Sequence, residues 1–261
     1  LEKIKFDNID LIDEIKSLGP YVNFFINSKE LAKLIIEDIG ENYGQVDIGA
    51  GKKIMVEFAH PNTHKAFHIG HLRNICTGES VSRILDNAGY EVVRANYQGD
   101  VGMHIAKSLW GINQLLDEYE EVRDKDLDER VKFLGKAYAL GGQTFEKDDD
   151  VKAEIIEYNK KIYSDSSDIA EMYKTTRQWS LDYFDKVYKR VGSHFDRFYF
   201  ESETFERGKE VVLEFLEKDI FKKSQGAVIF EGSKYDLHDR VFINSKGFPT
   251  YEAKDIALGE L

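Results

Sequence analysis

In the first half of the chain, strand-like and helix-like patterns alternate, and this alternation constrains the fold more than any other feature. Residues 52–60 are apolar at their centre and predict a buried strand. Residues 69–88 carry apolar side chains at helical spacing, and residues 91–97 indicate a second strand. A strand, a helix and a strand within this length predict a parallel βαβ unit. A further helix is expected to run to about Tyr119.

The N-terminal segment has a different pattern. Apolar residues within 9–18 predict a helix that stops at the following Gly-Pro pair, and residues 21–27 predict a strand. Ser28 is expected to cap a second helix, which ends at Gly40.

The segment that follows the βαβ unit is charged and rich in tyrosine. Residues 120–190 are therefore predicted to be helical, with the aspartates at 148–150 at a helix start. Strand patterns return at 195–200, 227–230 and 240–245. A helical segment thus interrupts an alternating α/β pattern.

Four regions follow from these patterns. They are an N-terminal unit at 1–45, the first half of a parallel-sheet domain at 46–119, a helical insertion at 120–194, and a continuation of that domain at 195–261. The expected fold class is α/β, with a Rossmann-like parallel sheet, a helical insertion and a small N-terminal α+β unit. The chain begins with Leu1 and ends at a predicted helix start, so we expect it to be part of a longer protein.

Composition excludes some classes of protein. The net charge of -12 argues against a protein that coats nucleic acid non-specifically, although it allows recognition of a folded RNA through local patches. No apolar run of about 18 residues predicts a membrane span, and no signal peptide is evident. The single cysteine, Cys76, excludes an internal disulfide and fits a cytoplasmic protein. We expect Cys76 to be a small core residue rather than a nucleophile.

The loop between the first predicted strand and helix carries histidines at 60, 64, 68 and 71. A helix start offers free backbone N–H groups and a positive dipole end, so phosphates bind there readily. Gly70 would let a flat ring approach the backbone, and His68 and His71 are spaced to face one ligand. A histidine-rich loop without a role and a zinc site are the alternatives, but no HExxH, CxxC or P-loop frame is present. The segment therefore predicts a nucleotide site.

Three segments carry a resemblance to a known family. They are VEFAHPNTHKAFHIGHLRN at 56–74, NYQGDVGMHIAK at 96–107 and RVFINSKGFPTYEAKDIAL at 240–258. The first contains the HIGH motif at 68–71 after a strand and before a helix, and all three together resemble the arginyl-tRNA synthetases, which are class I aminoacyl-tRNA synthetases. Ala59 and His60 stand where the family has serines, and Ala66 replaces a common proline.

The resemblance implies an ATP site formed by His68, Gly70, His71 and Lys65. The two histidines and the lysine are also implied to be catalytic. Lys65 stands just before the motif, as in family members that lack the key lysine of a later KMSKS signature. A solvated loop lysine is the alternative for Lys65.

The resemblance also implies an arginine pocket. Tyr251 and Asp255, one helical turn apart, are implied to recognise the guanidinium group. The other implied contacts are Glu57, Ala59, His60, Asn62 and His71. For Asn62 the side-chain oxygen would hold the α-amino group. The alternative for Glu57 is a buried acid that orients the loop. The alternative for Tyr251 and Asp255 is an exposed helix start.

Alternation along 21–27 places Asn23, Phe25 and Asn27 on one face with Tyr21. Amide and aromatic side chains can bond to and stack on unpaired RNA bases. The segment GPYVNFFIN at 19–27 is similar to the end of the N-terminal tRNA-contacting domain of the same family, and this resemblance implies contact with the tRNA elbow. An ordinary half-buried strand is the alternative.

The implied reaction forms arginyl-adenylate from L-arginine and ATP and transfers the arginyl group to tRNA(Arg). Mg²⁺ is expected to accompany ATP, with no metal site built from protein ligands. We expect a monomer without membrane association, and we expect that this chain alone does not charge tRNA. Two rival functions remain: a free nucleotidyltransferase with a HIGH-type motif, and a non-enzymatic module that holds tRNA or a partner.

Overall fold

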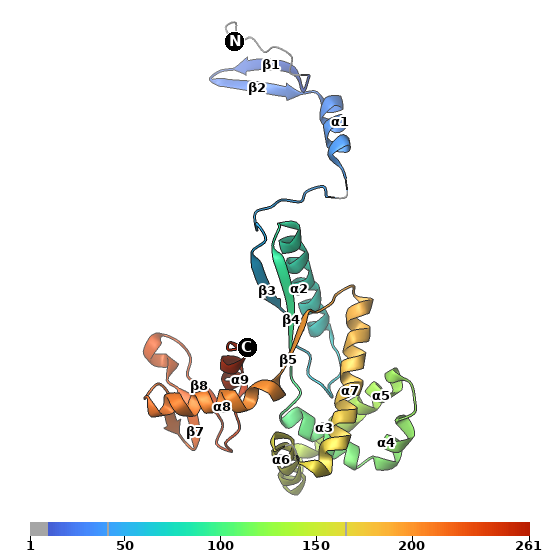
Figure 1. The fold of residues 1–261 in the computed structure, drawn as a ribbon, viewed down its shortest axis with the longest axis vertical. Coiled ribbons are helices and arrows are strands. Elements are labelled where there is room, and N and C mark those ends of the chain that lie inside the picture. Colours follow the sequence, from blue (N-terminus) through green and yellow to red (C-terminus); the bar gives the residue numbers. More distant parts are fainter. Residues whose placement is uncertain (1–9, 41, 165) are drawn as a thin grey trace.

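A computed structural model of the protein describes residues 10–40, 42–164 and 166–261. Figure 1 shows a small N-terminal unit that stands apart from the rest of the chain and joins it through an extended segment. The remainder has a central sheet, a block of helices at one end of it, and a C-terminal layer beside the block.

The N-terminal unit is a hairpin followed by a helix. Strands β1 (Ile12–Leu18) and β2 (Tyr21–Ile26) pair in antiparallel fashion, and helix α1 (Ser28–Asp38) follows. The predicted helix over residues 9–18 is therefore wrong for 12–18, and residue 9 lies outside the described residues. The physical reason is the Gly-Pro turn, in which Gly19 takes a φ of 60° and folds the segment back onto β2.

The first helix is capped one residue earlier than expected. Asn27, rather than Ser28, is the N-cap of α1, because its Oδ1 accepts hydrogen bonds from the backbone N–H groups of Lys29 and Glu30 at 2.9 and 3.0 Å. The expected end of this helix near Gly40 agrees with the structure, in which Ile39 is the C-cap.

The central sheet is parallel in the order β3-β4-β5. It contains β3 (Lys53–Glu57), β4 (Glu91–Gln98) and β5 (Arg197–Phe200), and helix α2 (Ile69–Asn87) forms the crossover between β3 and β4. The predicted βαβ unit is confirmed.

Burial in this unit differs from the prediction. Strand β3 lies at the edge of the sheet and alternates between exposed and half-buried residues, so it is not a buried strand. On α2 the apolar residues Ile69 and Ile84 are 79% and 68% exposed, and Cys76 is exposed rather than part of the core. The helix instead buries the face that contains Gly78, whose added Cβ would lie 2.2 Å from Phe58. Small residues on this face let the helix approach the sheet closely.

The block of helices follows β4. It comprises α3 (Met103–Asn113), α4 (Leu116–Val122), α5 (Leu127–Phe145), α6 (Asp149–Tyr163) and α7 (Ser167–Arg190). The single helix predicted to reach Tyr119 is thus two helices. As expected, the aspartate run starts a helix, because Asp148 is the N-cap of α6. The block has its own apolar core, around Ile105, Leu109 and Trp179.

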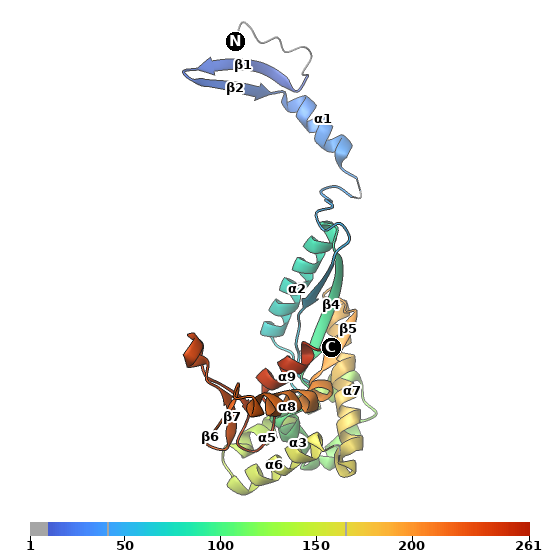
Figure 2. The same ribbon diagram turned by 60° about the vertical axis from the view of Figure 1, so that its left-hand side comes forward.

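The C-terminal layer combines two helices with a small antiparallel sheet. Its elements are α8 (Glu201–Glu217), β6 (Lys222–Ser224), β7 (Ala227–Phe230), the 3₁₀ turn η1 (Gly232–Tyr235), β8 (Arg240–Ile243) and α9 (Tyr251–Leu258). Figure 2 shows α9 lying along α8, close to the central sheet. A buried ion pair between Lys254 and Glu201, 2.8 Å apart, links the two helices.

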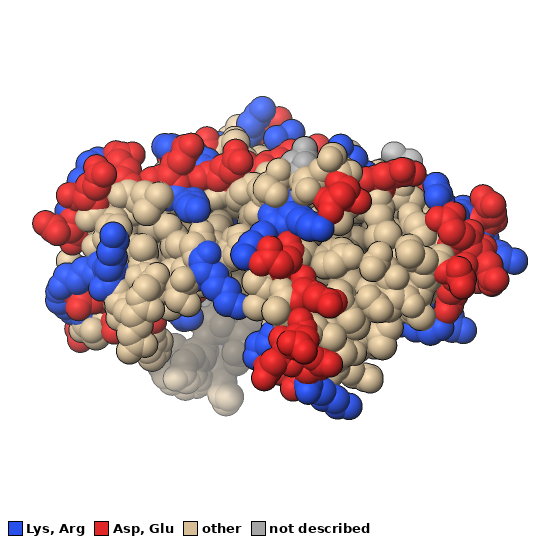
Figure 3. Space-filling model, turned by 90° about the horizontal axis from the view of Figure 1, so that it is seen from below, with Lys and Arg blue, Asp and Glu red and all other residues tan. Residues whose placement is uncertain are grey.

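Acidic and basic side chains are interspersed on the face seen from below the block (Figure 3). Such a surface fits the acidic composition rather than a broad nucleic-acid-binding face. Within the described ranges, no helix has both the length and the apolar character needed to cross a bilayer.

Candidate active site

Two histidines lie at the first turn of α2. His68 is the N-cap, and its Nδ1 accepts a hydrogen bond from the N–H of Gly70 at 3.1 Å. His71 Nδ1 accepts from the N–H of His68 at 3.2 Å, and the two rings stack with centroids 3.8 Å apart. Because each Nδ1 accepts, each neutral ring carries its proton on Nε2. This assignment provides two N–H donors at a helix start, where anions bind favourably.

Lys65 lies beside these histidines. Partial burial, and then the nearby His68 and Lys65, lower the pKa of His71, so its ring is held in the neutral form. The Nζ of Lys65 also lies 5.5 Å from the ring centroid of Tyr138, in the helical block. Lys65 is half-buried rather than a fully solvated loop residue.

A cavity of about 530 Å³ borders the start of α2. It is lined by Glu57, Phe58, Gly70, Arg73, Asn74, Thr77 and Gly78. A Cβ added to Gly70 would lie 2.9 Å from Cε1 of His68. Glycine at this position therefore leaves room for the ring that caps the helix, and it keeps the backbone accessible to a flat ligand.

The carboxylates of Glu57 and Asp255 interact electrostatically. Glu57 ends β3, and its Oε1 lies 3.5 Å from Nδ1 of His60. Partial burial, followed by the negative charges of Glu57 and Glu252, raises the pKa of Asp255. Since Glu57 is exposed, its interpretation as a buried orienting acid is wrong. The fold thus brings two acids, far apart in sequence, to a region where a cation would be favoured.

The backbone of the loop after β3 is tightly constrained. Ala59 and His60 adopt positive φ values of 81° and 49°, and the N–H of Ala59 donates to Asn74 Oδ1 at 2.7 Å. Asn62 pairs with Gly99 as an isolated parallel bridge, and a Cβ on Gly99 would lie 2.0 Å from Asn62 Oδ1. The glycine is required for this approach.

A second cavity, of about 430 Å³, lies between the helical block and α9. Lys65 and Tyr251 contribute to its lining, and Tyr251 is 60% exposed. His104 Nε2 and Asn159 Oδ1 are buried at this cavity without a hydrogen-bond partner among the described residues. Tyr251 lines this cavity, and Asp255 lies one helical turn further along α9. Both residues are exposed, which also agrees with the alternative that the pair is an ordinary exposed helix start.

The residues predicted to contact tRNA lie on the N-terminal unit. All six residues of β2 are exposed, so a half-buried strand is excluded. Asn23 and Phe25 are exposed, whereas the carboxamide of Asn27 is occupied: its Oδ1 caps α1 and its Nδ2 donates to Asp13 at 2.7 Å. The binding role of these residues stays a prediction.

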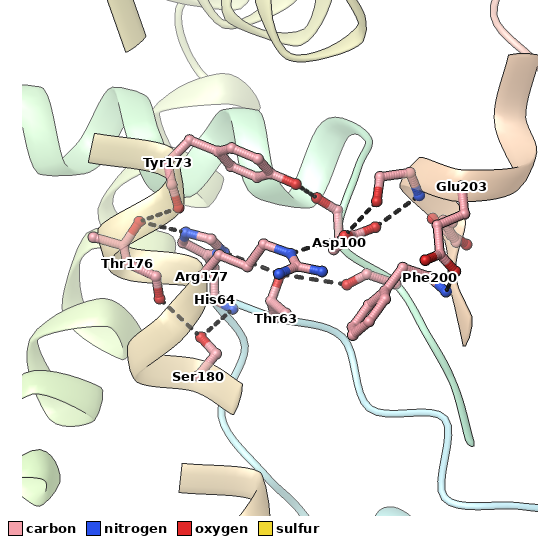
Figure 4. A network of polar contacts seen from close by, with 12 residues as sticks. Thr63, His64, Asp100, Tyr173, Thr176, Arg177, Ser180, Phe200 and Glu203 are labelled. Atoms are coloured by element: carbon pink, nitrogen blue, oxygen red, sulfur yellow. Dashed lines mark hydrogen bonds and ion pairs between the residues drawn. The ribbon is translucent and has the colours of Figure 1, made fainter. Parts of the chain in front are cut away.

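Behind the loop lies a buried polar network that no sequence pattern indicated (Figure 4). It joins His64 and Asp100 to side chains of α7 through hydrogen bonds and an ion pair. Asp100 belongs to one of the three segments that carried the family resemblance, but no pattern in residues 167–190 pointed to α7 as its partner.

The histidines of the loop do not converge on one point. His64 is buried against α7, whereas His68 is exposed at α2. Within residues 10–40, 42–164 and 166–261, no group of three or more His, Cys, Asp or Glu side chains is arranged to hold a metal ion.

A parallel βαβ unit with a free helix start directly after its first strand is an arrangement in which α/β sheets bind nucleotides. The chain belongs to the family described as tRNA synthetases class I (R), catalytic domain, whose model matches residues 32–260.

Curated relatives agree with this family. The chain is similar to the arginine–tRNA ligase of Treponema denticola, with 33% identity over 253 residues, or 92% of this chain and 42% of that protein. It is also similar to the arginine–tRNA ligase of Borreliella afzelii, with 33% identity over 254 residues, or 93% of this chain and 43% of that protein. The chain thus spans less than half the length of these relatives.

Solved structures support the fold. The arginyl-tRNA synthetase of Thermus thermophilus superposes with a TM-score of 0.66 at 22% identity, covering 99% of this chain and 42% of that chain. The arginyl-tRNA synthetase of Plasmodium falciparum gives a TM-score of 0.60 at 19% identity, covering 96% and 44%. The predicted α/β fold with a class I parallel sheet is confirmed.

Proposed function

We propose that the chain carries the arginine-activating site of an arginine–tRNA ligase. The arginine carboxylate attacks the α-phosphorus of ATP, the bond to the β-phosphate oxygen breaks, and pyrophosphate leaves. The arginyl group of the adenylate then passes to the terminal ribose of tRNA(Arg). One observation carries this proposal: the start of α2, where an anion would be favoured, borders the same cavity as Glu57, whose charge also acts on Asp255. The reaction joins an anionic triphosphate to a cationic amino acid, and these two features match the two substrates.

ATP is proposed to bind at the start of α2. The Nε2–H groups of His68 and His71 would donate to the α-phosphate as negative charge develops there. Gly70 would admit the adenine ring, and Lys65 would compensate phosphate charge from the side of the helical block. Mg²⁺ would enter with ATP, because phosphate oxygens and water supply most of its ligands.

Arginine is proposed to bind between β3 and α9. Asp255 and Glu57 would face the guanidinium group, and Tyr251 would border it. Asn62 would hold the α-amino group, while the segment at Ala59 and His60 would shape the pocket. His71 would lie between the two substrates.

The remaining parts would serve tRNA. We assign residues 1–45 to a tRNA-contacting unit, with Asn23 and Phe25 as contacts and Asn27 as the residue that orients them. Residues 120–194 would be an insertion into a catalytic domain formed by 46–119 and 195–261. The protein would act as a monomer in the cytoplasm.

The test is ATP–pyrophosphate exchange by the full-length protein that contains these residues, with arginine, lysine or citrulline as the amino acid. Citrulline has the shape of arginine without its charge, so exchange with arginine alone would support the carboxylate pair. Exchange with an acceptor other than an amino acid would favour a free nucleotidyltransferase. Binding of ATP or tRNA(Arg) without any exchange would favour a non-enzymatic module.

A further inference from the structure

One face of α7 carries a row of polar residues, of which Thr176 and Ser180 are buried and the other two half-buried. Tyr173, Thr176, Arg177 and Ser180 recur at helical spacing, on the face that meets the loop and the end of β4. Apolar side chains normally occupy such a face. Here the row exchanges hydrogen bonds with His64 and Asp100, so α7 is attached to the loop through specific polar contacts (Figure 4).

His64 is held through both its ring and its backbone. Its Nε2 lies 2.7 Å from Thr176 Oγ1, and its Nδ1 lies 3.1 Å from Thr63 Oγ1. The hydroxyl of Thr176 already donates to the carbonyl of Met172 at 2.7 Å, so it accepts from Nε2–H of His64. The N–H of His64 donates to Ser180 Oγ at 3.0 Å. These contacts define the ring tautomer and the position of the backbone together.

Asp100 is the second attachment. Its carboxylate is completely buried, and it accepts from Arg177 Nε at 2.9 Å and from both the N–H and the hydroxyl of Ser202 at 2.8 and 2.7 Å. Its carbonyl accepts from the hydroxyl of Tyr173 at 2.8 Å. One residue thus joins the end of β4 to α7 and to the first turn of α8.

The strained backbone of the loop depends on these contacts. His64 has a φ of 61°, in the left-handed region that a histidine adopts at a cost unless its surroundings enforce it. Lys65 follows directly, and His68, the N-cap of α2, lies four residues after His64. Whatever fixes His64 therefore also fixes the backbone from which Lys65 and His68 project.

We propose that His64 and Asp100, together with Thr176 and Arg177 on α7, are positioning residues for adenylate formation. The polar row holds the nucleotide loop in the arrangement that the transition state needs, and none of its members touches the substrates. This inference rests on the proposed function. Misplacing a reacting group by a fraction of an ångström slows the chemical step more than it weakens substrate binding.

The test uses three substitutions of α7 in the full-length protein. Thr176→Val removes the hydroxyl that accepts from His64 and keeps the shape, whereas Thr176→Ser keeps the hydroxyl. Thr175→Val makes the same change one residue earlier, on a side chain that bonds to Tyr119 instead. Single-turnover rates of arginyl-adenylate formation, the KM for ATP and the melting temperature are measured for each.

We expect Thr176→Val to slow adenylate formation about tenfold with less than about a twofold change in the KM for ATP. Thr176→Ser should restore the rate to within about twofold, and Thr175→Val should retain it. Equal rates in Thr176→Val and Thr175→Val would overturn the inference, as would a loss in Thr176→Ser as large as that in Thr176→Val. If the unaltered protein shows no arginine-dependent exchange, the proposed function fails first and the inference falls with it.

Discussion

His64 and His68 lie four residues apart in one loop, yet their surroundings are opposite. His64 is 1% exposed, and each of its ring nitrogens has a threonine partner. His68 is exposed, and its Nδ1 caps the helix that it begins. The buried histidine can fix the backbone, and the exposed one can meet a ligand. Identical side chains in one motif thus divide between supporting the site and forming it.

Burial and different neighbouring charges lower the pKa values of two histidines of this segment. Burial, and then the nearby His104 and Arg177, lower the pKa of His64 to about 3, so it stays neutral wherever the protein is folded near neutral pH. His71, partner of His68, has its pKa lowered by partial burial and by neighbouring charges that include Lys65. The buried His64 should therefore affect stability, and the rate only through the position of the loop, whereas the exposed His68 and its partner His71 should affect the rate directly.

The largest expected effect is on stability. Arg177→Met leaves the buried carboxylate of Asp100 without its cation, and the free energy of unfolding should fall by about 3–5 kcal/mol. Urea denaturation measures this change. Arg123→Met, which breaks an exposed ion pair with Glu120, is the control and should show no resolvable change. Equal stability of the two variants would mean that the buried network does not support the fold.

His68→Ala should act mainly on the rate of the reaction rather than on stability. Loss of one donor aimed at the developing phosphate charge should slow adenylate formation roughly 100- to 1,000-fold, with little change in the KM for arginine. His194→Ala, at another exposed histidine, is the matched control. Single-turnover rates of adenylate formation are measured for both variants. An unchanged rate in His68→Ala would show that His68 takes no part in catalysis.

Asp255→Asn should affect one substrate selectively. The change keeps the size of the side chain and removes the charge proposed to face the guanidinium, so kcat/KM for arginine should fall roughly 10- to 100-fold. The KM for ATP should stay nearly constant. Glu252→Gln, on the same helix, should leave arginine use within about twofold. A larger effect on ATP than on arginine would place the pocket elsewhere.

The last expected effect is a change in the pH dependence of stability. Because the folded pKa of His64 is about 3 and the unfolded value is 6.5, the unfolded chain binds the additional proton between these values. The contribution of the neutral His64 ring to stability is therefore fully present above pH 6.5 and is lost as the pH falls toward 3. His64→Gln should reduce the slope of unfolding free energy against pH by about 1.4 kcal/mol per pH unit within this window.

Urea denaturation at several pH values measures this slope. His194→Gln, at an exposed histidine, should leave it unchanged. Equal slopes in the two variants would show that the histidine at position 64 titrates in the folded protein much as it does in the unfolded chain.

Local patterns were enough for much of the fold. The strand, helix and strand around α2 could be predicted because hydrophobic periodicity and the glycine after the helix are local signals. The segment before Gly19 was misassigned, because antiparallel pairing with β2 overrides a weak helical pattern. Cys76 was misplaced for a related reason. Apolar spacing predicts that a helix has an apolar face, but it does not determine which face the sheet covers.

The same division applies to the site. The sequence by itself determined a histidine-bearing loop at a helix start, because helix N-termini bind anions through groups defined by a few consecutive residues. Only the tertiary structure decided that the charge of Glu57 acts on Asp255, and that Asp100 binds Arg177 inside the protein. Those contacts join residues tens to hundreds of positions apart. Their strength comes from removing charges from water, which depends on the packed fold and on no local pattern.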